Sequence, residues 1–87
     1  MYKIYYTKQA LKDIKKIKNT PLEKKAKEII TLLQEDPFTT PPSYEKLLGD
    51  LSGAYSRRMN IQHRIVYEVF EELQSVKILR MWSHYGE

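Results

Sequence analysis

The sequence contains no cysteine, which excludes disulfide bonds, thiolate metal sites and cysteine nucleophiles. It also lacks any apolar run near the roughly 20 residues that a membrane-spanning helix requires, and its first residues do not follow the pattern of a signal peptide. Repeats, low-complexity stretches and domain linkers are missing as well. With 87 residues, the chain is too short for two independent domains. We therefore expect one cytoplasmic domain, residues 1–87, without a membrane partner.

Histidine is scarce, whereas positive charge is not. The two histidines lie far apart in the sequence without paired acidic residues beside them, so the spacing typical of a metal site is missing. We expect neither a metal nor another cofactor. Lysine and arginine outnumber aspartate and glutamate by 15 to 11, which gives a net charge of +4. This charge favours polyanionic partners such as nucleic acid or acidic protein segments.

The first half of the sequence begins with a predicted strand and helix. Alternation over residues 2–6 indicates the strand. Thr7 is a suitable N-cap for a helix whose apolar residues, Leu11, Ile14 and Ile17, recur every third position. Five lysines occupy the remaining faces of this helix: Lys8, Lys12, Lys15, Lys16 and Lys18.

A second helix is predicted by the segment TPLE, with Thr20 as N-cap, Pro21 at the first helical position and Glu23 closing a capping box. One apolar stripe follows, and residues 35–37 end the helix. The short spacing between the two helices predicts an antiparallel hairpin. The stripe consists of Leu22, Ala26, Ile29, Ile30 and Leu33.

Beyond a proline-rich connection, the apolar period changes to two, which indicates strands. A turn is expected at Gly49–Asp50. The resulting order, β-α-α-β-β-β, predicts an α+β fold: a mainly antiparallel sheet with the two-helix hairpin packed on one face. The other face is left for function. The strands are expected near residues 44–48, 54–59, 64–70 and 76–82.

Arginines gather around the central predicted hairpin. If its loop holds an odd number of residues, Arg58 lies opposite Arg64 on the face that Ile65, Tyr67 and Val69 do not use. An even loop would bury one of these arginines against the helices, which is costly without a partner. We therefore favour the odd loop, with two guanidinium groups side by side on an otherwise open sheet. A phosphate would bridge them, because guanidinium donors match phosphate oxygens.

Two further residue types complete a chemical set for cutting RNA. Internal attack needs a base for the 2′-hydroxyl, a cation for the phosphorane and an acid for the leaving 5′-oxygen. Glu45, Arg64 and His84 are of these types, and histidine transfers protons near neutrality. The alternative is that the arginines are solvated strand charges paired with Glu68, Glu71 or Glu72.

The segment YEKLLGDLSGAYSRRMNIQHRIVYEV, from Tyr44 to Val69, together with the HY pair near the C-terminus, resembles the YoeB/Txe toxins of bacterial toxin–antitoxin systems, within the RelE-like superfamily. The match is densest there, and the helical half matches in arrangement more than in residues. The resemblance implies a ribosome-dependent endoribonuclease that cuts mRNA in the A site and thereby inhibits translation. It also implies a cognate, YefM/Axe-like antitoxin whose disordered segment wraps the toxin, and self-association as a homodimer.

The resemblance also assigns roles to individual residues. It implies Glu45 as general base, His84 as general acid and Arg64 as the group that stabilises the charged phosphate. Arg58 would assist Arg64, and Tyr85 would orient the RNA by stacking on a base.

Two departures from the family pattern concern the same site. Leu48 stands where a lysine that contacts phosphate is expected; Lys46, two residues earlier and on the same side of an extended strand, is the candidate replacement. The sequence also continues beyond the His-Tyr pair with Gly86 and Glu87, which would place negative charge near the phosphate site.

Four points stay open at this stage. His63 rivals His84 as the acid, and we interpret it as a structural residue or an RNA contact. A noncatalytic inhibitor of a protein such as DNA gyrase is a second function known among superfamily relatives, and a plain RNA-binding module is a third. The lysines of the first helix are either a solvated face or a contact with ribosomal RNA phosphates.

Overall fold

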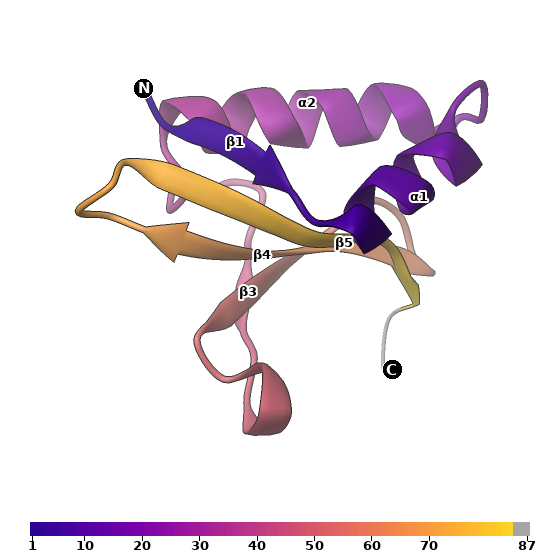
Figure 1. Ribbon diagram of the computed structural model, residues 1–87. Helices are drawn as coiled ribbons and strands as arrows, with labels where there is room; N and C mark the ends of the chain where they lie inside the picture. The colour runs from indigo at the N-terminus through magenta and orange to yellow at the C-terminus, as the bar shows by residue number, and fades with distance from the viewer. Residues whose placement is uncertain (85–87) are drawn as a thin grey trace.

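The computed structural model of the protein describes the backbone of residues 1–84 and the side chains of residues 1–82. Its two helices lie on one side of a five-stranded sheet (Figure 1). A short 3₁₀ helix, Gly49–Leu51, follows the fold's shortest strand. In chain order the elements are β1 Lys3–Tyr6, α1 Lys8–Ile17, α2 Leu22–Glu35, β2 Glu45–Lys46, β3 Ala54–Arg58, β4 His63–Phe70 and β5 Ser75–His84.

The sheet has the strand order β1-β5-β4-β3-β2. Only the β1–β5 pair is parallel among these strands, and the other three pairs are antiparallel. The prediction of an α+β fold with a mainly antiparallel sheet and both helices on one face is confirmed. The core lies between the helices and the sheet, where Ile29 and Leu33 of α2 join Ile65, Tyr67 and Ile78 of the central strands.

The predicted apolar face of α1 is partly wrong. Leu11 is 50% exposed, whereas Ala10, Asp13 and Ile17 are buried. Each helical residue is rotated by about 100° from the one before it, so Leu11 turns away from the sheet when Ala10 faces it. The charged residue Asp13, which the prediction did not place on this face, is therefore buried on it.

The apolar stripe of α2 is confirmed, since Ala26, Ile29 and Leu33 are buried. Its start differs from the prediction by one residue, because the helix begins at Leu22. Pro21 has helical dihedral angles, φ −59° and ψ −21°, but stands just before the helix. The predicted reciprocal bond to Thr20 is replaced by a bond from the Asn19 backbone N–H to the Glu23 carboxylate, 3.4 Å long. The Thr20 hydroxyl instead accepts a bond from the Leu22 backbone N–H.

The strand after the proline-rich connection is shorter than predicted. Regular pairing covers only Glu45–Lys46, followed by one further bond from the Leu47 backbone N–H to the Ala54 carbonyl, 2.9 Å long. The chain then turns at Gly49, whose φ of +70° lies in the left-handed region that glycine adopts without strain. β2 is thus a short edge strand, held on one side by β3. Among the described residues, no helix is long and apolar enough to cross a bilayer.

Candidate functional site

The β3–β4 hairpin has the register that the sequence predicts. Arg58 pairs with Arg64 across the two strands, and five residues separate them. The Asn60 side chain shapes the turn by accepting bonds from the backbone N–H groups of Gln62 and His63, at 2.8 and 2.7 Å. The odd connection is confirmed, and it places both arginines on the face opposite the helices.

The surroundings of these two arginines differ from the prediction of an open sheet. Arg58 is exposed, but only 6% of Arg64 is accessible to solvent. Ser56 and Val66, on the same face, are also buried. The expectation that both guanidinium groups lie on an otherwise open sheet was therefore wrong for Arg64. Arg64 instead lies in a site that excludes most water, where its charge acts more strongly on a nearby anion.

Glu45 lies on the same face as Arg58. It pairs with Ser56 across β2 and β3, and Ser56 stands two residues before Arg58, so all three point to one side of the sheet. A pocket of about 320 Å³ is lined by Glu45, Ser56 and Arg58 together with Pro42 and Ser43. The structure thus brings the predicted base and one of the predicted phosphate-binding arginines into one pocket.

Lys46 lies on the other face. It pairs with Tyr55, whose ring packs against the core. Lys46 lines a different hollow, which it shares with Leu47, Leu48 and Gly53. It is exposed at the edge of the sheet, but the register does not bring it into the pocket of Glu45 and Arg58. Its predicted contact with substrate would need the RNA to pass around this edge.

His63 and His84 form the last backbone pair of β4 and β5, at the end of the sheet away from the β4–β5 turn. His84 ends β5 and is the backbone partner of His63 in β4, and Arg64 is paired with the neighbouring Ser83. The His63 ring is buried and lies 4.2 Å from the ring of Trp82, centre to centre. This packing agrees with a structural role for His63. The side chain of His84 and all of Tyr85 lie outside the described residues, so their predicted roles stay predictions.

The predicted base and acid stand on opposite sides of the two arginines. Glu45 is on β2 and His84 is at the end of β5, and the intervening strands β3 and β4 carry Arg58 and Arg64. Across the strands this offset is three inter-strand spacings of about 4.8 Å, roughly 14 Å at the backbone. Along the strands, the backbone of His84 lies four residues beyond Arg80, the β5 residue in register with Glu45.

A buried arginine, Arg57, was not predicted to have a role. It is only 1% exposed and lies on the helix face, opposite Ile65. Its guanidinium group donates to the Tyr67 hydroxyl at 2.9 Å. Burial raises the pKa of Tyr67, and the neighbouring Arg57 charge offsets part of that rise. Three backbone carbonyls accept the other bonds: those of Pro37 at 2.9 Å, Thr39 at 2.8 Å and Pro42.

A buried carboxylate, Asp13, was also missed. Its Oδ2 atom accepts bonds from the Arg80 guanidinium at 3.0 Å and from the backbone N–H groups of Met81 and Trp82, at 2.9 and 3.2 Å. Its Oδ1 atom accepts a 3.0 Å bond from the side chain of Gln9. Burial alone would raise the pKa of Asp13, but these hydrogen bonds and the Arg80 charge together lower it. This contact ties α1 to the last residues of β5.

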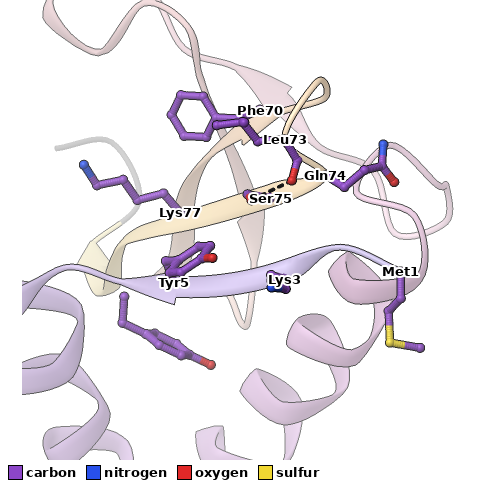
Figure 2. Close-up of a pocket in the computed structure, with 9 residues that line it drawn as sticks. Met1, Lys3, Tyr5, Phe70, Leu73, Gln74, Ser75 and Lys77 are labelled. Carbon is purple, nitrogen blue, oxygen red and sulfur yellow. Dashed lines mark hydrogen bonds between the residues drawn. The ribbon is translucent and has the colours of Figure 1, made fainter.

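A second, larger pocket of about 630 Å³ lies at the opposite end of the sheet (Figure 2). Tyr5 of β1 and Phe70 of β4 border it, with Lys3 and Lys77 beside them and Leu73 in the β4–β5 turn. None of the predicted site residues within residues 1–84 lines it. In that same part of the chain, no group of three acidic or histidine side chains is placed to hold a metal ion.

Known proteins resemble this chain in sequence and in structure. The model of a family described as YoeB-like toxins of bacterial type II toxin–antitoxin systems matches residues 6–85. A YoeB toxin from Mycobacterium bovis is 39% identical over 57 residues; the match covers 66% of this chain and 65% of that toxin, slightly less than two thirds of its length.

Two solved structures share the fold over nearly their whole length. A YoeB/ParE toxin from Agrobacterium tumefaciens has a TM-score of 0.85 and 28% identity, over 95% of this chain and 99% of that one. The toxin in a heterotetrameric YoeB–YefM complex from Staphylococcus aureus has a TM-score of 0.81 and 31% identity, over 98% and 99% of the two chains.

Proposed function

Because this chain belongs to the family of YoeB-like toxins of bacterial type II toxin–antitoxin systems, we propose that it inhibits translation as a ribosome-dependent endoribonuclease. Its substrate is the mRNA in the ribosomal A site. The observation that supports this activity best is the pocket that Glu45 shares with Arg58, next to the register pair of Arg58 and Arg64. A carboxylate beside two guanidinium groups suits a base that works next to a phosphate.

The reaction is an internal transfer at phosphorus. The Glu45 carboxylate takes the proton of the 2′-hydroxyl group, and the 2′-oxygen forms a bond to the adjacent phosphorus. As the bond from phosphorus to the 5′-oxygen breaks, His84 donates a proton to that oxygen. The products are a 2′,3′-cyclic phosphate and a free 5′-hydroxyl group, so each proton that is removed is matched by one that is delivered. The residues act without a metal or another cofactor.

The two arginines have different parts in this reaction. Arg64 is a buried guanidinium group, so it is a preorganised cation for the phosphorane, where negative charge increases. Arg58 is exposed and lines the pocket, so it meets the incoming phosphate from the solvent side. Tyr85 orients the RNA by stacking on a base.

The ribosome supplies what this small site lacks. A free RNA rarely holds its 2′-oxygen in line with the leaving 5′-oxygen, and fixing that geometry contributes several kcal/mol to a rate enhancement. The decoding centre positions the message, while the toxin brings the acid, the base and the charge. Because the ribosome positions the RNA, a single face of a small sheet is sufficient to carry the catalytic residues.

The proposed partners are inferred from the family and from a relative that was solved in complex with YefM. A cognate YefM-like antitoxin holds the toxin inactive in the cytoplasm, as expected for a toxin–antitoxin pair. The S. aureus relative was solved as a heterotetramer with YefM, which supports both an antitoxin partner and a second toxin copy for this chain. Measuring the mass of the purified chain in solution, alone and with its antitoxin, tests this point.

The decisive experiment maps 5′ ends of an mRNA bound to programmed bacterial ribosomes. Wild-type protein should produce one cut, confined to the A-site codon and absent without ribosomes. Arg64→Ala should lower the single-turnover rate by about 10²- to 10³-fold, as the loss of one charge-stabilising group does in other enzymes. Lys77→Ala is the matched control, because it removes one positive charge from the far end of the same face. It should change the rate by less than about threefold.

Circular dichroism must show that Arg64→Ala is folded, because the side chain is buried. Arg64→Lys provides a second variant that keeps the charge. A folded wild-type protein that makes no cut would overturn the nuclease proposal and favour the alternative, a noncatalytic inhibitor of a protein target such as DNA gyrase. Cutting that survives loss of Glu45 and Arg64 would also contradict the mechanism.

A further inference from the structure

We propose that Arg57 is a positioning residue for the proposed base: its buried guanidinium group fixes the connection between α2 and β2 and thereby holds Glu45 in the pocket with Arg58. The inference rests on the proposed function, since it needs Glu45 as the base. Arg57 touches neither the substrate nor the reacting atoms in this scheme.

The connection, residues 36–44, has internal hydrogen bonds at its start, where the backbone N–H groups of Phe38 and Thr39 donate to Asp36. It contains three of the chain's four prolines, namely Pro37, Pro41 and Pro42, and proline has no backbone N–H to donate. Neither a helix nor a strand includes it. Its carbonyl groups therefore need donors from elsewhere, because buried carbonyls are almost always paired.

Arg57 supplies those donors. Its Nη2 atom donates to the carbonyls of Pro37 and Thr39, at 2.9 and 2.8 Å, and its Nη1 atom donates to the carbonyl of Pro42. Its Nε atom donates to the Tyr67 hydroxyl, so the guanidinium group is itself anchored to β4. The ring of Tyr44, 5.0 Å from the guanidinium carbon, adds a cation–π contact. A single planar group thus binds the connection at three carbonyls.

The fixed segment leads directly to the site. Pro42, whose carbonyl Arg57 holds, lines the pocket, and so does the next residue, Ser43. Glu45 follows two residues later on a strand only two residues long at the edge of the sheet. Such a short edge strand offers little hold of its own. The aromatic cluster of Phe38, Tyr44 and Tyr55 packs the same segment, with ring centres 5.6–6.1 Å apart.

Alternation along β3 explains how one strand performs two tasks. Neighbouring strand residues point to opposite faces. Arg57 therefore points to the helix side and holds the connection, while Arg58 points to the pocket. The SRR motif thus joins a phosphate-binding residue to the residue that positions the base beside it.

The test uses Arg57→Met, which keeps an apolar stem without donors, and Arg57→Lys, which keeps a charge without the planar fork. Ile29→Ala is the control, because it perturbs the buried face of α2 away from the pocket. Amide hydrogen exchange should increase at least tenfold in residues 38–46 of Arg57→Met, relative to α2. In Ile29→Ala, the exchange rate in residues 38–46 should increase by the same factor as the exchange rate in α2. Arg57→Lys should lie between wild type and Arg57→Met.

The second readout is cleavage on programmed ribosomes at saturation. Arg57→Met should lower the single-turnover rate by about 10²-fold, because misplacing a reacting group by about 1 Å has an effect of that size. Glu45→Gln should have a much smaller effect in the Arg57→Met background than in the wild-type background, since both changes remove the same positioned base. In the Ile29→Ala background, Glu45→Gln should keep its full effect.

Each outcome decides the inference. Faster exchange together with loss of the Glu45→Gln effect supports it. Faster exchange with an undiminished Glu45→Gln effect overturns it, because Arg57 would then order the connection without positioning the base. Unchanged exchange overturns it as well. If folded wild-type protein cuts no RNA, the proposed function fails and the inference fails with it, while the exchange data still decide whether Arg57 holds the connection.

Discussion

Asp13 and Arg57 are two buried charges of opposite sign, and both make hydrogen bonds to the protein backbone. Asp13 accepts from two backbone N–H groups of β5, and Arg57 donates to three carbonyls of the α2–β2 connection. They differ in what they join. Asp13 joins a helix to a central region of the fold, whereas Arg57 joins a strand to a segment without regular structure. One therefore supports the fold, and the other shapes a local site.

The electrostatic surroundings of the two charges differ as well. Asp13 has an ion-pair partner in Arg80, whose side chain is 42% exposed. The Arg57 guanidinium group donates to the Tyr67 hydroxyl and to three backbone carbonyls, which are all neutral oxygens. Loss of Arg57 leaves the buried Tyr67 hydroxyl and three carbonyls of the connection behind. The carbonyls of Thr39 and Pro42 are only partly buried, so we expect them to take up water when the connection opens locally. Loss of Asp13 also leaves the backbone N–H of Met81 without its acceptor. The Met81 side chain is buried, so water cannot replace that acceptor.

The largest expected effect on stability comes from breaking the Asp13 contact. Asp13→Ala should lower the free energy of unfolding by about 3 kcal/mol, because it removes several buried hydrogen bonds to a charged group. Arg57→Met should lower it by only about 1–2 kcal/mol, since local opening of the connection limits the loss. Urea denaturation followed by circular dichroism measures both values.

The same pair of variants should reverse its order when activity is measured. Each variant is compared with a control of equal stability in the same cleavage assay. Arg57→Met should lose more activity than its control. The activity of Asp13→Ala, corrected for its folded fraction, should fall less than that of Arg57→Met. If Arg57→Met were the less stable protein of the two, the distinction between a charge that supports the fold and one that shapes the site would be wrong.

Both charges show where prediction from the sequence stopped. The period-two pattern predicted the hairpin register of Arg58 and Arg64, and helical spacing predicted the face of α2, because both are set by neighbours close in sequence. We expected that an arginine without a partner would not be buried against the helices. Arg57 is buried there because it has partners, which are carbonyls 15–20 residues away in the sequence. The alternation of side chains along the strand places Arg57 on the helix side of the sheet. It was the one sequence signal available for the burial of Arg57.

The candidate site was predictable to a similar extent. The residue types and the hairpin brought Arg58 and Arg64 together correctly, and Glu45 lies in the strand that was expected after the proline-rich connection. The burial of Arg64 was not foreseeable, because it depends on how the whole face packs. Lys46 was placed by distance along the sequence, but pairing with Tyr55 turns it to the other face. For Asp13, its position three residues after Ala10 and four before Ile17 was a helical signal that attention to apolar residues missed.

A smaller effect should appear in the pH dependence of stability, and only for Asp13. Its pKa is lower in the folded protein than the value of about 3.9 in an unfolded chain. Its contribution is therefore complete well above pH 3.9 and is lost as the pH falls toward the folded value. Asp13→Asn should show a shallower loss of unfolding free energy than wild type below about pH 4, measured by urea denaturation at several pH values.

Arg57→Met is the matched control for this pH series. An arginine stays protonated throughout the acidic range, so removing it should leave the acid slope as steep as in wild type, even though the stability is lower at every pH. Equal slopes for wild type and Asp13→Asn would show that the Asp13 carboxylate is not the group whose protonation weakens the fold.

The smallest effect on the chemical step is expected on the solvent side of α1, the helix that carries Asp13. Five lysines are exposed there or just beyond the end of the helix: Lys8, Lys12, Lys15 and Lys16 on α1, and Lys18 after it.

Reversing three of them, Lys8→Glu, Lys12→Glu and Lys15→Glu, should slow ribosome association by about tenfold at low salt, because such charges steer a protein toward RNA phosphates. Single-turnover cleavage on saturating ribosomes should stay within about twofold of wild type, since neither buried charge nor the pocket is altered. Reversal of Lys24, Lys25 and Lys27 on α2 changes the net charge equally and is the control. Equal slowing by both triple variants would assign the effect to net charge, and a large fall in the saturated rate would show that the α1 lysines take part in more than association.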